Sequence, residues 1–198
     1  MRILVVALVL VSGWGAYDGY VHRDRHHPPG QIAPDEPRQR SIANSASFRS
    51  GDFTLTPRAE FSAEARVLAK ESYYVDAGAK LIPVDFAMGW GPMSDTALIE
   101  RLRISQSGRF YFWGYSGAPP APHEEIIRSS ANMHLIPADS SVKKVLSAAR
   151  VGDVVAIEGD LVDAKSDSGW SLTTSLTRDD SGAGACEIVY VRRASVRK

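Results

Sequence analysis

The chain reads EFSAEARVLAK over residues 60–70, and this stretch decides the class of fold. Its odd-numbered positions, from Phe61 to Ala69, are apolar, while every even-numbered position except Leu68 is polar or charged. Successive side chains of a β-strand point to opposite faces, so this alternation predicts a long strand with one buried face. Other strands are predicted at residues 109–115, 153–163, 170–176 and 187–192.

Helical patterns are shorter and fewer than the strand patterns. One begins at Ser94 or Asp95, one covers residues 123–129, and one begins at Asp139 or Ser140. Aspartate and serine are common caps at helix N-termini, which supports the first and last of these starts. The order of elements predicts an α+β, β-rich single domain. It would be built on a mainly antiparallel sheet or an OB-like, partly closed barrel, with two or three short helices and a preceding N-terminal hydrophobic helix.

The N-terminus carries a run of 15 uncharged residues, from Ile3 to Tyr17, after the basic Arg2. At 1.5 Å per residue this run spans roughly 22 Å as a helix, against a hydrocarbon core of about 30 Å. Continuing to residue 21 adds length and only one acid, Asp18. Residues 1–21 are therefore predicted to be a signal-anchor, a single transmembrane helix in the inner membrane with the C-terminal domain in the periplasm. The alternative is cleavage near Ala16 and secretion to the periplasm.

Residues 22–50 are predicted to be a proline-rich linker, because four prolines fall within residues 28–37 and proline blocks helices and sheet ladders. Residues 51–198 are then the β-rich extracytoplasmic domain. They contain 17 Lys or Arg against 19 Asp or Glu, so nucleic acid is an unlikely partner. The single cysteine, Cys186, cannot form an internal disulfide and is interpreted as a small buried hydrophobe, with a reactive thiol or an intermolecular bridge as the alternative.

The segment from Pro83 to Asp95 is the most unusual part of the domain. Trp90 stands between two glycines, with Asp85 and Asp95 on either side. It is either a ligand-binding loop, with Trp90 as a stacking surface, or a structural loop in which Trp90 fills the core and Asp95 caps the next helix.

Four more residues complete the speculative ligand-binding set. His134 occurs in an apolar run and is expected to be buried, either as a structural residue or as a general base. Arg178 and Asp179 are expected to pair within their own loop or to hold a cation. Arg109 opens the aromatic strand at 109–115. No metal site, cofactor or catalytic residue is predicted, because no motif with suitable spacing occurs.

Several of these segments carry a resemblance. They are residues 83–95, 104–109 and 130–139, together with 175–178 and 182–186. Through them the chain resembles a family of uncharacterised bacterial proteins with an N-terminal membrane segment and one extracytoplasmic domain. The resemblance implies a single folded domain outside the cytoplasm behind an anchor, and it brings no activity or catalytic residue with it.

Three functions are compatible with these features. The first is a non-enzymatic, membrane-anchored periplasmic module that binds an envelope protein or a small ligand. The second is an envelope hydrolase that uses His134 with Asp85, Asp95 or Asp179. The third is an OB-type nucleic-acid binder, which the near-neutral charge of the domain disfavours.

Overall fold

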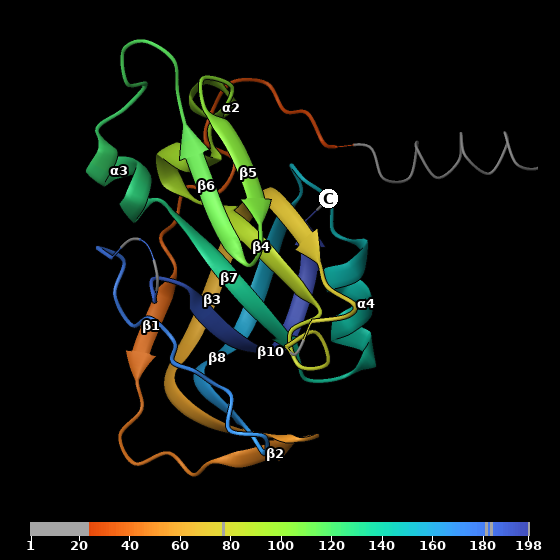
Figure 1. Cartoon of the computed structure of the whole chain (residues 1–198). Coiled ribbons are helices and arrows are strands. Elements are labelled where there is room, and N and C mark those ends of the chain that lie inside the picture. The colour runs from red at the N-terminus through yellow and green to blue at the C-terminus, as the bar shows by residue number, and fades with distance from the viewer. Residues whose placement is uncertain (1–23, 77, 181, 183, 198) are drawn as a thin grey trace, which may run out of the picture.

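A computed structural model describes residues 24–76, 78–180, 182 and 184–197 (Figure 1). Strands make up 46% of it and three helices 13%, which confirms the predicted β-rich fold with a mainly antiparallel sheet. The predicted signal-anchor at residues 1–21 lies outside the described residues. Among the described residues, no helix is long and apolar enough to cross a bilayer.

Five strands form a closed ring. Around the ring each strand is hydrogen-bonded to the next, and the last, β8, pairs with the first, β3. Every pairing is antiparallel except that between β7 and β10. In ring order the strands are β3 (Phe53–Ser72), β4 (Val84–Gly89), β7 (Ser130–Pro137), β10 (Glu187–Arg197) and β8 (Val154–Ser166).

Strand β3 closes the ring because it is long enough to serve two neighbours. Its first part, Phe53–Arg66, pairs with β8, and its last part, Arg66–Ser72, pairs with β4. The pairing with β4 is irregular between Val67 and Ala69, so the break in alternation at Leu68 is a bulge in the strand. The apolar positions before it, including Phe61, face the core inside the barrel.

Helix α4 and the connection from β4 to β7 each cover a part of the barrel. Helix α4 (Ser140–Ala148) connects β7 to β8 and buries Val142 and Leu146 against the core. As predicted, Asp139 caps it, accepting hydrogen bonds from the backbone N–H groups of Ser141 and Val142 at 2.8 and 2.9 Å.

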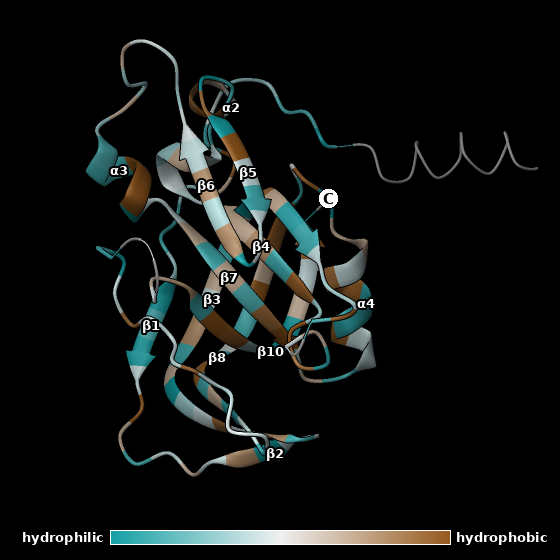
Figure 2. Ribbon diagram, in the orientation of Figure 1, coloured by the Kyte–Doolittle hydropathy of each residue, from teal (hydrophilic) through white to brown (hydrophobic). Residues whose placement is uncertain are grey.

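The connection from β4 to β7 forms a second layer over the outer face of these two strands (Figure 1). It contains a two-stranded hairpin, whose tip lies between residues 107 and 110, together with one short 3-10 helix and two short α-helices. Apolar side chains of this layer form a small core of their own, which Figure 2 shows as brown bands on the hairpin and helices. The elements are η1 (Gly91–Ser94), α2 (Thr96–Ile99), β5 (Arg103–Ser107), β6 (Phe110–Gly114) and α3 (His123–Arg128).

Residues 24–50 differ from the expected linker, since they lie along the barrel. Strands β1 (Arg38–Ser41) and β2 (Phe48–Ser50) both pair with β3. Ala33 is buried, and the Arg25 N–H donates to the Val151 carbonyl at 2.8 Å. The prolines interrupt this segment only between its paired stretches, so the remaining N–H groups are free to join the sheet. The predicted strand at 170–176 is also reduced, to β9 (Ser171–Leu172).

Candidate functional site

The site begins with a cross-strand pair on the outer face of the barrel. In the register of β4 and β7, Asp85 lies directly opposite His134. Their neighbours along the strands, such as Phe86 and Met133, point into the barrel core, so Asp85 and His134 point outward. Asp85 Oδ1 lies 2.9 Å from His134 Nδ1, off the line of the N–H bond, so the contact is an ion pair rather than a straight hydrogen bond. Asp85 is completely buried.

Arg109 reaches this pair from the tip of the hairpin. Its backbone φ of 68° allows the tight turn there, and its own N–H donates to the Tyr73 hydroxyl at 3.0 Å. The guanidinium lies 3.9 Å from the centre of the Tyr73 ring and 3.3 Å from Asp85 Oδ1. It also donates to Asp76 Oδ1 and Oδ2 at 2.8 and 2.9 Å. The hairpin is thus held over Asp85 by charge-assisted contacts.

These contacts determine the charge of His134. Burial by itself disfavours the imidazolium, but the Asp85 carboxylate and Cys186 outweigh burial and raise the pKa of His134 to about 9. The ring therefore carries a proton at neutral pH. Asp85 occupies its Nδ1 edge, which leaves Nε2 as the edge that can exchange a proton with a neighbouring group.

Cys186 joins the site from the start of β10. Asn132 Nδ2 lies 3.4 Å from its Sγ, and Cys186 is close enough to His134 to contribute to the raised pKa of that ring. The Asn132 amide is itself oriented by two contacts: Gln106 donates to its oxygen, and its Nδ2 donates to the Arg109 carbonyl at 3.0 Å. Cys186 is only partly buried, so the prediction of an enclosed small hydrophobe is wrong.

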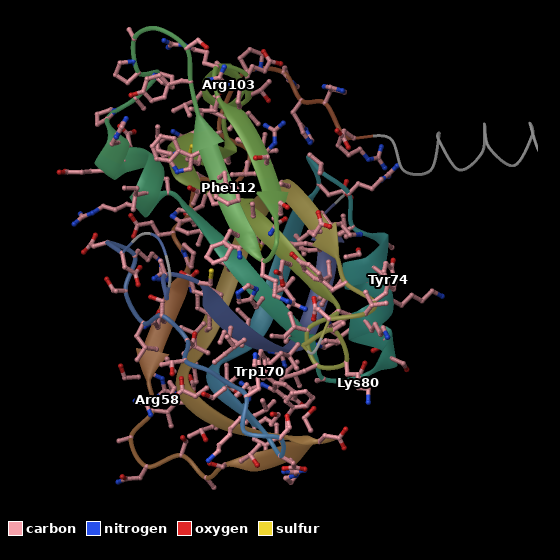
Figure 3. All side chains as sticks on the ribbon, viewed as in Figure 1. Arg58, Tyr74, Lys80, Arg103, Phe112 and Trp170 are labelled. Carbon is pink, nitrogen blue, oxygen red and sulfur yellow. The ribbon has the colours of Figure 1, made fainter. Side chains whose placement is uncertain are left out.

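A cavity of about 520 Å³ opens above this cluster. This volume is within the usual range for small-molecule sites. The cavity, which we call the barrel pocket, lies between the outer face of the barrel, the hairpin tip and the loops at residues 73–83 and 167–186; Figure 3 labels Trp170 at its rim. Its lining combines aromatic rings with convergent polar groups and includes Tyr73, Phe110 and Trp170 together with Asp76, Arg109, His134 and Cys186.

A second buried ionisable group lies next to the site along β10. Glu187 is 4% exposed, and its Oε2 has no hydrogen-bond partner among the described residues. Burial raises the pKa of Glu187 to about 8, and Arg178 opposes this shift only in part. Glu187 is therefore mostly a neutral acid at pH 7.

We predict that the protein loses stability as the pH rises from about 5 to 9. The folded-state pKa values of Glu187 and His134 are both raised, from 4.5 to about 8 and from 6.5 to about 9. A raised pKa stabilises the fold below the unfolded-state value, and this contribution is lost as pH passes through the folded-state value. Urea titrations should show a decrease of roughly 2 to 4 kcal/mol in the free energy of unfolding across this range.

Glu187→Gln is the matched variant for this pH dependence, since it keeps the shape and removes the titration. It should flatten the stability profile between about pH 5 and 6.5 and reduce its slope up to about pH 8, while leaving the slope due to His134 between about pH 6.5 and 9. A wild-type profile that is flat between pH 5 and 9 would contradict the prediction.

The structure brings three of the seven sequence-predicted site residues together: Asp85, Arg109 and His134. Trp90 instead fills the barrel core with 1% of its surface exposed. Asp95 caps α2 by accepting from the Ala97 N–H at 2.8 Å, and it also accepts from the Gly30 N–H. These are the structural roles that the sequence offered as the alternative.

The expected pairing of Arg178 with Asp179 is not observed. Asp179 pairs with Arg128 at 2.7 Å on the surface. The Arg178 guanidinium lies 5.8 and 5.9 Å from the rings of Phe61 and Trp90, at the end of the barrel. Arg178 and Asp179 therefore do not line the barrel pocket.

Sequence analysis missed Cys186, Tyr73 and Asp76 as members of the site. Tyr73 and Asp76 follow the end of β3 in an ordinary polar loop. One sequence feature could have drawn attention to Cys186: it follows the small residues 182–185 and directly precedes a predicted strand. Nothing in the sequence indicates that it would lie near a histidine 52 positions earlier. Comparison with protein-family models, with curated proteins and with solved structures finds no match to this chain.

Proposed function

We propose that this protein is a membrane-anchored, extracytoplasmic binding module whose small ligand occupies the barrel pocket. The observation that carries this proposal is the cavity of about 520 Å³, in which three aromatic rings surround a compact group of charged side chains. Binding sites for small molecules are typically mostly apolar with a few well-placed polar groups.

We also propose that the domain is an OB-like barrel. In support, the five strands of the ring follow one another along the chain as β3, β4, β7, β8 and β10. In this chain order β4 and β7 are the second and third strands, and α4 connects the third strand, β7, to the fourth, β8. OB-folds bind their ligands on the face of strands two and three, between the loops that join strands one to two and four to five. The barrel pocket occupies this position here, since residues 73–83 and 167–186 are those two loops.

The lining suggests the chemistry of the ligand. The exposed surface inside the pocket is mainly apolar, with contributions from Leu172 and Ile188 as well as the rings. Polar groups gather at one place, where Arg109, His134 and Cys186 meet. A small molecule with an apolar body and one polar end fits this division. Nucleic acid fits less well, because the arginines near the barrel surface such as Arg40 and Arg193 are paired with acids.

The start of the described chain is docked on the barrel, apart from the pocket. Residues 24–33 are held there through contacts such as His27 Nε2 with the Gly152 carbonyl at 2.9 Å, and none of these residues lines the barrel pocket. In Figure 1 this segment lies at the upper end of the molecule, whereas Figure 3 labels Trp170 toward the lower end. If residues 1–21 span the membrane, this docking holds the barrel close to the bilayer.

Binding can be tested with the fluorescent probe 1-anilinonaphthalene-8-sulfonate, an aromatic anion. We expect saturable binding at one site per chain, with a Kd in the micromolar range. Leu172→Trp fills the pocket and should weaken binding at least about tenfold. Leu176→Trp is the control, since Leu176 is 43% exposed and outside the pocket. Absence of saturable binding, or equal binding by the two variants, would contradict the proposal.

An envelope hydrolase is the second candidate, and one observation favours it. His134 lies beside an acid and also lines a cavity open to solvent, which is the arrangement of a histidine that transfers protons as a general acid or base. Of the three acids that the sequence offered as its partner, only Asp85 is in contact with it.

A further inference from the structure

We propose that Cys186 is a nucleophile, paired with His134 and supported by Asp85, that accepts an acyl group from a carboxylic ester bound in the barrel pocket. This inference rests on the proposed pocket and goes beyond binding. It makes the second candidate function specific, since it names the attacking atom and the class of substrate.

The geometry is that of a nucleophile, a base and an orienting acid. Cys186 and His134 both line the barrel pocket, and Sγ lies 3.4 Å from Nδ2 of Asn132, which is two residues before His134 on the same face of β7. Asp85 Oδ1 is 2.9 Å from Nδ1 of the imidazole. Thiol nucleophiles are activated by an adjacent histidine whose orientation is set by a third group.

Each member is held by the fold. Asp85 and His134 are opposite each other in a register fixed by six paired positions of β4 and β7. Cys186 immediately precedes β10, whose parallel pairing with β7 begins at Glu187. Asn132, two residues before His134 on the same face, contacts Sγ at 3.4 Å. The thiol is therefore positioned by three adjacent strands rather than by a free loop.

The charged groups around the thiol support its role. The His134 ring is protonated at neutral pH and places a positive charge near the thiol. The Asp85 carboxylate that contacts this ring also lies 3.3 Å from Arg109, which is itself paired with Asp76. On β10 the adjacent Glu187 is buried and mostly neutral at pH 7. Asp85 acts through His134 and is a positioning residue.

The reaction balances with water as the only co-reactant. The thiol proton is held on His134 while Sγ bonds to the ester carbonyl carbon. The C–O bond to the alcohol then breaks, and His134 returns the proton to the leaving oxygen, which leaves an acyl group on Cys186. Water adds to this thioester with loss of a proton to His134, the C–S bond breaks, and His134 returns the proton to Sγ, which releases the carboxylic acid and restores the thiol. The apolar lining fits an acyl or aromatic group on the substrate.

The first test measures alkylation of Cys186 by iodoacetamide, followed by intact mass. The chain has one cysteine, so the adduct reports this thiol alone. At about pH 6 the wild type should react at least roughly tenfold faster than His134→Gln. His123→Gln is the matched control, because His123 contacts the Tyr115 hydroxyl away from the pocket, and it should react at the wild-type rate. The wild-type chain unfolded in guanidinium gives a reference that needs no variant and should react more slowly than the folded protein.

The second test uses p-nitrophenyl acetate. We expect release of nitrophenol, an acetyl adduct on Cys186 by mass spectrometry, and loss of both in Cys186→Ala. Equal alkylation rates in wild type and His134→Gln, alkylation no faster than in the unfolded chain, or no acetyl adduct would each overturn the proposal. Probe binding by the wild type separates the two proposals: if the wild type binds the probe but forms no acetyl adduct, the pocket stands and the nucleophile does not.

Discussion

Asp85→Leu is expected to lower the free energy of unfolding by about 3 to 5 kcal/mol near pH 6, the cost of removing one partner from a buried ion pair. Asp85 is completely buried between two cations, His134 and Arg109. Without its carboxylate, the imidazolium and the guanidinium would face each other with no compensating charge. Urea-induced unfolding, followed by circular dichroism, measures the difference between variant and wild type.

Two controls make this expectation specific. Asp76→Asn removes the other acid that pairs with Arg109, but Asp76 is 40% exposed, so the loss should be about 1 kcal/mol or less. The cost of Asp85→Leu should also shrink as the pH rises from about 6.5 to 9, because the stability that the wild type gains from protonated His134 beside Asp85 is lost over this range. Equal losses for Asp76→Asn and Asp85→Leu, or a loss independent of pH, would show that the buried pair does not govern stability here.

Gly159→Ala is expected to cost at least about 3 kcal/mol, or to prevent folding, because it adds an atom where two strands approach most closely. A Cβ on Gly159 would lie 1.9 Å from the carbonyl oxygen of Tyr190, which is backbone and cannot rotate away. Gly159 is in β8, paired with both β3 and β10, so the clash can be relieved only by opening the barrel.

Gly114→Ala is the matched control for Gly159→Ala. A Cβ at Gly114 would meet nothing within 4 Å, and this glycine does not have a positive φ. Its stability should stay within about 0.5 kcal/mol of the wild type. The melting temperatures of both variants test this expectation. A Gly159→Ala protein with the melting temperature of the wild type would contradict the close packing of β8 against β10.

Local patterns predicted the elements well wherever one face is buried. The alternation at 60–70 became the centre of β3, and the cap at Asp139 starts α4. Prediction was weaker where polar residues pair with the sheet at its margin. Residues 38–41 and 48–50 carry little apolar pattern, yet they pair with β3, because strand pairing depends on backbone groups that every residue except proline possesses.

The candidate site was predictable only in part for a different reason. Sequence singled out Asp85, Arg109 and His134 as separate possibilities, but it could not say which acid would meet the histidine. That choice is made by the pairing register, which places Asp85 opposite His134 and leaves Asp95 to cap a helix and Asp179 to pair with Arg128. The pairing register depends on burying the same face of two neighbouring strands. The sequence of one strand does not contain that information.

By itself, the sequence determined that this protein is β-rich, that β3 is long and one-faced, and where the helices begin, because alternation and capping depend on residues close together in the chain. Only the tertiary structure decided that the strands close into a ring, that Cys186, His134 and Arg109 line one pocket, and that the buried Asp85 contacts His134 and Arg109. These four residues come from different elements and are up to about a hundred positions apart in the chain. Closing such long loops costs chain entropy, and this cost is offset only when all five strands pack around one core.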